Sequence, residues 1–368
     1  MPLEFREEKL RETLDGIEPL ANLRALEVMA AVQAGAQDEM SLLKRARADE
    51  NIEYLFLDRI HGDDAAGELR KNKIILRGSS PDGRLCGAVS NPVPLEDELG
   101  DVLEKAMRHA GLNEDTLGRR AAVAPGRIRD AINYRPELSS DELRRLATVL
   151  GLNEVGLCAL ACGRYPLPSP AALPFALHPL RMRHGIGVAN AYVVAEHGAN
   201  RGVLFDTGPC IETLEAVWPP GVREVDAVFL THAEGEHAGG LCPVVERFRI
   251  REAYCPRGAK VACGEAIEEG EKRVFGNLAV RAFSTPGHAP AHNCYLVEAR
   301  SADAGAALLV CGDLFFAGSV GGAQFCRRQL AANLRRMLES VPPETVIAPG
   351  HGPLTTVENE LRYNPFVL

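Results

Sequence analysis

The sequence predicts an α/β protein built from an N-terminal α+β region, an all-α region and a C-terminal region in which strands and helices alternate. Apolar runs in the C-terminal region, such as "VLFDTG" and "LLVCGD", are strand-like and end in polar residues. The middle of the chain instead carries helical patterns with capping residues. At 368 residues the chain is also longer than one ordinary core, so two or three domains are expected.

The composition is that of a soluble globular protein, with 46% hydrophobic and 25% charged residues. A net charge of −9 argues against general attraction to nucleic acids or membranes, although a local basic face is compatible with it. The N-terminus "MPLEFREEKLRETL" lacks the apolar core of a signal peptide. We therefore expect a cytoplasmic protein that does not bind membranes. The 10 cysteines include no C-x-x-C pair, so no disulfide framework is predicted.

Two proline-containing segments divide the chain. The segment "SNPVPLEDE" closes an N-terminal region, residues 1–90, which contains helix-like periodicity and two strand-like runs, "IEYLFLDRI" and "NKIILRG". This region has no chemical motif, and sensing, dimerisation and simple packing all remain open for it. The segment "GRYPLPSPAALP" predicts an extended linker over 163–177, because its proline density is high. A helical domain, 94–162, and a C-terminal domain, 178–368, flank that linker.

The predicted helical domain has recognisable helix starts and ends. Gly111 closes the first helix, Asn113 is placed to cap the second, and Ser139 or Ser140 opens a capping box. This succession resembles the helix-turn-helix of phage-repressor-like regulators over about 60 residues. The resemblance implies a recognition helix at 124–133 that presents its polar side chains to double-stranded DNA. Those side chains are Arg127, Arg129 and Asn133.

The local charge gives partial support to DNA binding. Between Lys105 and Arg135 the chain carries seven lysines and arginines against three acidic residues, but the flanking helices are acidic. Phosphate contacts supply most non-specific affinity for DNA. The basic face would therefore have to be presented cleanly, and we expect a homodimer for this reason. The alternative is a small helical bundle that contacts other proteins.

Four motifs follow one another in the C-terminal region: "THAEGEHAGG", "STPGHAPAH", "LVCGDLFF" and "APGHGP". Together with "VLFDTG" they resemble the metallo-β-lactamase superfamily over residues 178–368. The resemblance implies a four-layer αββα sandwich with a mono- or dinuclear metal site at one edge of its two sheets. Two divalent ions a few Å apart need several ligands and a shared anion, and the histidines and carboxylates of these motifs supply both. The implied ligands are His232, Glu234 and His288 in the first pocket, Glu236, His237 and His351 in the second, and Asp313 as the bridge.

Further residues take supporting roles under the same resemblance. Asp206 of "FDTG" is expected to hold a ligand histidine or the metal loop, and His292 is expected to line the pocket. Asp313 and Glu236 are the candidate catalytic residues. Asp313 would orient the nucleophile, and Glu236 would share in handling its proton.

Two positions depart from the usual metal loop. Glu234 replaces an imidazole by a carboxylate, which favours harder ions and resembles the flavodiiron proteins on the same fold. Glu236 is one methylene longer than the aspartate these families use, so the second ion could be shifted, weakly held or absent. We expect two divalent ions, with zinc as the first choice and iron or manganese as alternatives.

Three functions fit these observations. The first is a metal-dependent hydrolase that activates water against an ester, thioester, lactone or phosphodiester in a small-molecule substrate. The second is a diiron sensor or oxygenase that responds to oxygen or nitric oxide and controls transcription. The third is a transcription regulator whose metal-binding fold only binds a small ligand.

Overall fold

The computed structural model describes residues 93–135, 138–169, 171–185, 187–300 and 306–368, and the backbone of two short strands before them. The chain divides into two compact units, residues 1–90 and 91–368. In the first unit, β1 (Ile52–Leu57) and β2 (Ile74–Gly78) pair as antiparallel strands, within the two runs predicted as strands. The helix-like segment predicted before them lies outside the described residues.

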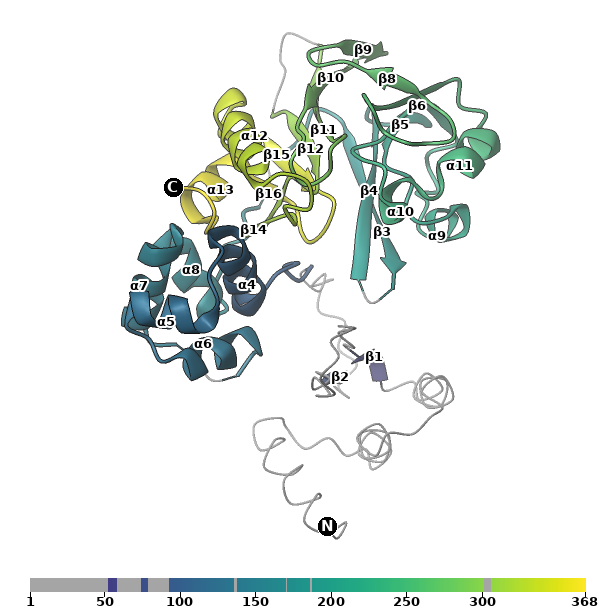
Figure 1. Ribbon diagram of the computed structural model, residues 1–368. Coiled ribbons are helices and arrows are strands. Elements are labelled where there is room, and N and C mark those ends of the chain that lie inside the picture. Colours follow the sequence, from purple (N-terminus) through teal and green to yellow (C-terminus); the bar gives the residue numbers. More distant parts are fainter. Residues whose placement is uncertain are drawn as a thin grey trace. The chain divides into compact units, whose positions relative to one another are not determined.

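The second unit begins with a bundle of five helices (Figure 1). The Asn113 side chain accepts a hydrogen bond from the Thr116 backbone N–H, and Ser139 forms a capping box with Glu142, so both predicted caps are present. Their apolar faces meet in one core that includes Leu117. The helices are α4 (Leu99–Ala110), α5 (Glu114–Ala121), α6 (Pro125–Ile132), α7 (Ser140–Leu150) and α8 (Glu154–Ala161).

The C-terminal domain contains two six-stranded sheets that pack face to face. Side chains alternate between the two faces of a strand: Val203 and Phe205 lie in the core between the sheets, whereas Leu204 points to the opposite face. The first sheet has the order β3 (Ala176–His184), β4 (Gly187–Ala195), β5 (Arg201–Phe205), β6 (Glu224–Phe229), β7 (Glu252–Pro256), β8 (Glu265–Ile267). The second has the order β16 (Thr355–Thr356), β15 (Val346–Pro349), β12 (Leu308–Gly312), β11 (Asn293–Ala299), β10 (Leu278–Ser284), β9 (Lys272–Phe275).

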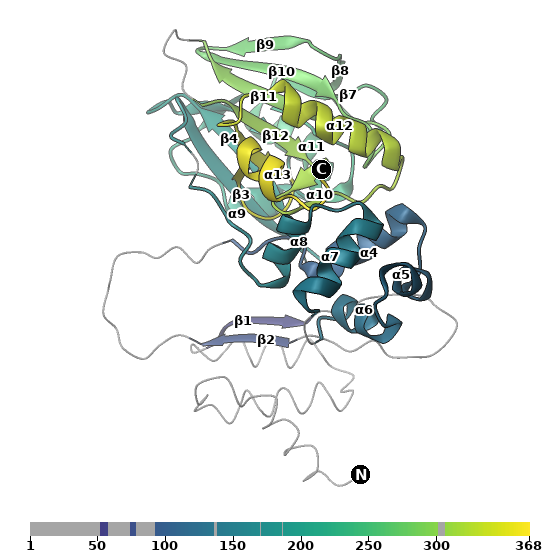
Figure 2. The ribbon, with the colours of Figure 1, turned by 90° about the vertical axis from the view of Figure 1, so that its left-hand side faces the viewer.

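Helices cover the outer face of each sheet (Figures 1 and 2). Leu214 of α9 (Ile211–Ala216) and Val244 of α11 (Leu241–Phe248) pack on the first sheet. Leu334 of α12 (Arg327–Ser340) and Val357 of α13 (Val357–Tyr363) pack on the second. The predicted four-layer αββα sandwich is therefore confirmed. The short elements α10 (Gly235–Ala238), β13 (Phe315–Phe316) and β14 (Ser319–Val320) lie in the connections that follow β6 and β12.

The helical bundle and the C-terminal domain share part of their cores. Tyr165 lies in the segment predicted as a linker, yet it is buried in the bundle core and its hydroxyl donates to Glu360 at 2.9 Å. Tyr363 and Phe366, near the C-terminus, pack on the same core. Gly156 allows this close approach, because a Cβ there would lie 1.8 Å from the Tyr363 carbonyl oxygen. Within the described part of the chain, no helix is long and apolar enough to cross a membrane.

Candidate metal centre

The candidate metal ligands lie in loops at the carboxyl ends of strands. The pairs β5–β6 and β12–β15 are each parallel, so their carboxyl ends lie at common edges of the two sheets. Asp206 directly follows β5, Asp313 follows β12, and His351 comes two residues after β15. His232, three residues after β6, forms an isolated β-bridge with His292, just before β11. That bridge joins the edge of one sheet to the edge of the other.

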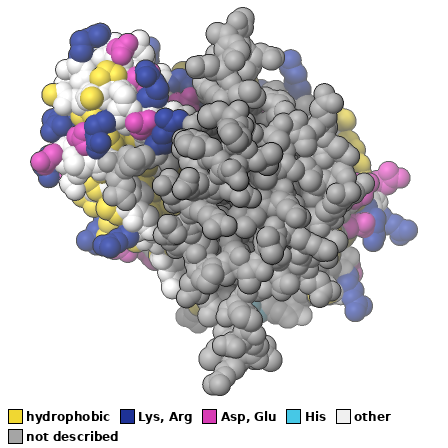
Figure 3. Space-filling model, turned by 90° about the horizontal axis from the view of Figure 1, so that it is seen from below, with side chains coloured by type: hydrophobic (Ala, Val, Ile, Leu, Met, Phe, Trp, Pro, Cys, Tyr) yellow, Lys and Arg dark blue, Asp and Glu magenta, His cyan; other side chains and the backbone are white. Residues whose placement is uncertain are grey.

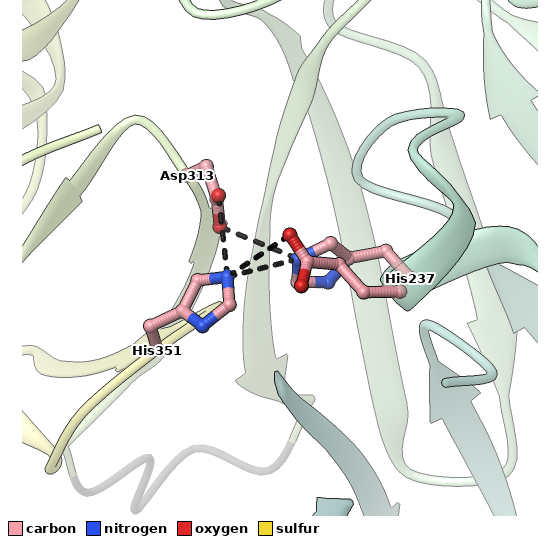
Figure 4. A group of neighbouring side chains, drawn as sticks. His237, Asp313 and His351 are labelled. Carbon is pink, nitrogen blue, oxygen red and sulfur yellow. Dashed lines mark hydrogen bonds and ion pairs between the residues drawn. The ribbon is translucent and has the colours of Figure 1, made fainter. Parts of the chain in front are cut away.

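The structure brings two groups of donor side chains together around Asp313. In each group the donor atoms lie within 4.8 Å of one another. Figure 4 shows His237 and His351 pointing toward each other and toward Asp313. Their Nε2 atoms are 3.3 Å apart, and His351 Nε2 lies 3.4 Å from Asp313 Oδ2. The groups are Glu236, His237, Asp313 and His351 on one side, and His232, His288 and Asp313 on the other.

The histidines of both groups are oriented in the same way. In each, Nδ1 is hydrogen-bonded to a protein group behind the ring. This is the arrangement of metal-binding histidines, whose outer hydrogen bond fixes the tautomer and aims the other nitrogen at the ion. The Nδ1 contacts are His232 with Thr231 Oγ1 at 2.9 Å, His237 with Asp206 Oδ2 at 3.2 Å, His288 with the Gly322 carbonyl at 2.8 Å and His351 with the Val188 carbonyl at 2.9 Å.

Buried polar atoms at the centre fit a divalent cation. Nε2 of His232 and Oδ1 of Asp313 have no hydrogen-bond partner among the described residues. Such atoms are costly to bury unless something satisfies them, and a cation would do so here. Gly350 makes room for the shared carboxylate, because a Cβ there would lie 2.1 Å from Asp313 Oδ1. The residues present therefore fit a dinuclear metal site.

The two unusual glutamates occupy different positions. The Glu236 carboxylate is a member of the second group, with Oε1 3.7 Å from His351 Nε2, so its longer side chain still reaches the pocket. Glu234 belongs to neither group: its Oε1 lies 3.1 Å from His288 Nε2, outside the cluster around Asp313. The assignment of Glu234 to the first pocket therefore requires its side chain to turn inward.

Carboxylates and imidazoles are buried close together at the centre, and they shift each other's pKa. Burial by itself raises the pKa of the Asp313 carboxyl, but His237 and His351 outweigh it and hold that pKa well below its usual range. Burial lowers the pKa of His351, whereas Asp313 and Glu96 outweigh this effect and raise it to about 10. The carboxylates thus provide the negative charge that bound cations would balance.

Asp206 and His292 surround the ligands without belonging to either group. The Asp206 carboxylate accepts hydrogen bonds from the Thr231 backbone N–H at 2.7 Å and from its hydroxyl at 2.8 Å. Asp206 therefore holds the start of the metal loop. It also holds the His237 ring, because its carboxylate contacts His237 Nδ1. His292 contacts Thr285 Oγ1 through Nδ1 at 2.8 Å, and burial lowers its pKa to about 3. Its ring lies 5.3 Å from that of His232, so it lines the centre.

One residue near the centre comes from an unexpected part of the chain. Glu96, just before α4, places Oε1 3.9 Å from His351 Nδ1. The next residue, Asp97, accepts hydrogen bonds from Lys105 of α4 and from the Ser319 hydroxyl of β14, which fixes this segment against the C-terminal domain. The only sequence signal was the acidic run "EDE", and nothing in it indicated the metal centre.

A family model for the metallo-beta-lactamase superfamily matches residues 184–351. The C-terminal half of the chain is a metallo-beta-lactamase superfamily domain. It is similar to an uncharacterized protein of Aquifex aeolicus, with 28% identity over 48% of this chain and 90% of the relative. Protein ML0493 of Mycobacterium leprae, also uncharacterized, is 27% identical over 50% of this chain and 95% of its own.

Solved structures are similar to about half of the chain. TTHA1623 in a di-iron-bound form is 32% identical and covers 51% of this chain and 99% of its own, with a TM-score of 0.41. ETHE1 from Myxococcus xanthus is 23% identical, with coverages of 52% and 83% and a TM-score of 0.43. The B3 metallo-beta-lactamase BLEG-1 is 26% identical, with coverages of 51% and 98% and a TM-score of 0.43.

Proposed function

We propose that the C-terminal domain is a metal-dependent hydrolase that cleaves an ester, thioester, lactone or phosphodiester bond. The observation that carries this proposal is the pair of donor groups sharing the Asp313 carboxylate, each with imidazole nitrogens aimed at a common centre. We further propose that Glu234 completes the first pocket when a cation draws its carboxylate inward, since its Oε1 is already 3.1 Å from His288 Nε2.

Divalent ions bound there would lower the pKa of a water molecule and polarise the electrophilic centre of the substrate. Asp313 would orient the attacking water by accepting its hydrogen bond through a carboxylate oxygen. The Glu236 carboxylate would accept the proton and pass it to solvent, because its side chain is 24% exposed whereas that of Asp313 is 5% exposed. This difference in exposure is the reason for giving proton transfer to Glu236.

The side chains of Glu234 and Glu236 are 33% and 24% exposed, so solvent and substrate reach the centre on their side. Two divalent ions would more than balance the carboxylates of Asp313, Glu234 and Glu236. The charge of the centre therefore excludes neither a neutral ester, thioester or lactone nor an anionic phosphodiester, and the proposal keeps all four bond types.

The test combines metal analysis with a substrate panel. Protein purified under air and without oxygen should contain about two ions per chain, and should cleave at least one ester, thioester, lactone or phosphodiester. A chelator should abolish this activity, and added zinc, manganese or iron should restore it. A protein that binds two ions and cleaves no member of the panel, phosphodiesters included, would contradict the hydrolase proposal.

Glu234 also supports a second candidate, a diiron centre that responds to oxygen or nitric oxide. A carboxylate beside imidazoles favours iron over zinc. Two irons per chain, with a visible absorption band that changes with oxygen, would favour this candidate. Colourless protein containing two zinc ions would exclude it.

We also propose that the helical bundle binds double-stranded DNA as a dimer through α6. The support is the succession α5–α6, two eight-residue helices joined by a short turn in which Ala122 has a positive φ of 51°. Three intramolecular contacts compete with DNA for these side chains. Arg127 pairs with Glu142 at 2.6 Å, Arg129 pairs with Glu114 at 3.1 Å, and the amide of Asn133 donates to the Arg129 carbonyl. Basic and acidic side chains are also interspersed on the visible face of the bundle (Figure 3).

The side chains of Arg127 and Arg129 are 45% and 56% exposed, so DNA phosphates can reach them. Glu142 is only 14% exposed and holds Arg127 through two hydrogen bonds, so a phosphate would have to displace it. A double variant, Arg127→Ala with Arg129→Ala, should weaken DNA binding while leaving the metal content unchanged. The affinity should also fall steeply with salt, as expected for phosphate contacts. Unaltered DNA binding by the double variant would rule out α6 as the contact helix.

A further inference from the structure

Two cysteines outside the metal centre lie unusually close together. The Sγ atoms of Cys242 and Cys263 are 2.7 Å apart. This separation is shorter than ordinary contacts between non-bonded heavy atoms, which lie at about 3.5–4.0 Å. It exceeds the sulfur–sulfur bond of a disulfide, about 2.05 Å, by a fraction of an ångström. A small movement of either side chain would therefore bring the sulfurs to bonding distance.

Both cysteines are placed where a small reagent can reach them. Each is partly exposed, whereas Cys255, Cys294 and Cys311 are buried. Cys242 lies in the first turn of α11, and Cys263 lies in the loop between β7 and β8. Among the described residues, no other pair of cysteines has its sulfur atoms this close together.

We propose that Cys242 and Cys263 form a reversible disulfide, a redox modification site beside the metal loop, with a low-molecular-weight disulfide as the oxidant. One cysteine sulfur, as thiolate, attacks the oxidant, forms a mixed disulfide and releases one small thiol. The second cysteine sulfur then attacks the protein-bound sulfur of that mixed disulfide and releases the other small thiol. Two protein thiols are oxidised, one small disulfide is reduced to two thiols, and the thiol protons pass to the departing thiolates.

The step needs a thiolate, because the thiolate is the nucleophile. Burial, together with the contact with Cys242, raises the pKa of Cys263 to about 11. Formation of the disulfide should therefore be faster at alkaline pH.

The site adjoins the metal loop through the chain itself. The loop 231–240 ends where α11 begins, and Cys242 is the second residue of that helix. Gly240 donates its backbone N–H to the Gly208 carbonyl at 3.0 Å, and this bond fixes the end of the loop. A disulfide would tie the start of α11 to the β7–β8 connection. It would therefore restrain the element that carries Glu236 and His237.

Peptide mapping tests the proposal on the full chain. The protein is incubated with excess oxidised glutathione, free thiols are alkylated, and the protein is digested with trypsin without reduction. Cleavage after lysine and arginine leaves Cys242, Cys255 and Cys263 in three separate peptides, 224–247, 252–257 and 261–272. We expect the first and third peptides to be linked, with the loss of two hydrogens, and dithiothreitol to separate them.

Thermal unfolding provides an independent readout. Because the crosslink closes a loop of about 20 residues, oxidation should raise the Tm by roughly 5–10 °C, and reduction should reverse the increase. Cys242→Ser and Cys263→Ser should each abolish the linked peptide and the shift. Cys326→Ser, which removes another partly exposed thiol, should retain both.

Three results would overturn the proposal. One is glutathione attached to each cysteine with no link between the two peptides. Another is a link from Cys242 to Cys255 in place of Cys263. The third is an oxidation-dependent Tm increase that persists in both serine variants. Should either variant fail to fold, the peptide map of the unaltered protein decides the question without it.

Discussion

The second metal pocket brings four donor residues together, whereas the first brings three and leaves Glu234 against His288. Both pockets share Asp313, and both aim histidine nitrogens inward. They differ in where their glutamates sit. The Glu236 carboxylate is already within reach of His237 and His351. The comparison teaches that Glu236 needs no rearrangement to serve as a ligand, and that the first pocket is the one that must rearrange to gain a fourth ligand.

The largest expected effect is that of removing the shared ligand. Asp313→Ala should reduce metal binding in both pockets and lower hydrolytic activity by more than roughly 100-fold, since even partners behind a ligand typically contribute 10–100-fold. Elemental analysis measures the loss of metal, and the rate of hydrolysis of the panel substrate that the protein cleaves fastest measures the loss of activity. Asp226→Ala serves as the control. Asp226 lies near the start of β6, away from the strand end that leads to His232, so this variant should retain both ions. Full activity in Asp313→Ala would remove the bridging role.

An intermediate effect is expected from Asp206→Asn. The amide cannot stabilise the His237 ring as the carboxylate does through its 3.2 Å contact with Nδ1. Affinity in the second pocket should therefore fall by roughly 10–100-fold, while the first pocket changes little. A metal titration that resolves the two ions provides the measurement. An equal loss in both pockets would mean that Asp206 acts mainly through Thr231 and the loop.

The smallest effect separates the two glutamates directly. Glu234→Gln should lower the affinity of the first pocket by roughly tenfold, because we propose that a bound cation draws the Glu234 carboxylate inward, at the cost of its contact with His288. The matched variant Glu236→Gln should lose more affinity in the second pocket, because the Glu236 carboxylate is already in place. An unchanged first pocket in Glu234→Gln would show that Glu234 is not a ligand.

The sequence predicted strands that end just before His232, Asp313 and His351, and the structure has strands there. The grouping of these side chains around one centre was implied by the resemblance to the metallo-β-lactamase superfamily and did not follow from the strand pattern. Glu96 could not be predicted in the same way. Its approach to His351 depends on how the segment before α4 packs against the C-terminal domain, where Ser319, 222 residues further along the chain, donates to Asp97. Lys105 of α4 also holds Asp97.

Local pattern was also misleading where tertiary packing decides. The proline-rich segment around Tyr165 has the composition of a linker, but its aromatic ring fills a core shared by both parts of the second unit. The contact between Cys242 and Cys263 had no spacing signal, because the two residues are joined only by the fold of α11 and the β7–β8 loop. Nothing in the sequence predicted that the Glu234 side chain would turn toward His288.

The packing of Tyr363 and Phe366 on the helical bundle has a consequence for how the protein unfolds. Asn153 of the bundle bonds to the Pro365 carbonyl at 2.7 Å, so the last residues of the described chain complete the bundle rather than the sandwich alone. A fragment ending before residue 363 would leave the groove beside Gly156 empty, and an isolated bundle would expose Leu157 and Leu160. Residues 93–368 should therefore unfold in one cooperative thermal transition, in which the helical bundle and the αββα sandwich unfold together.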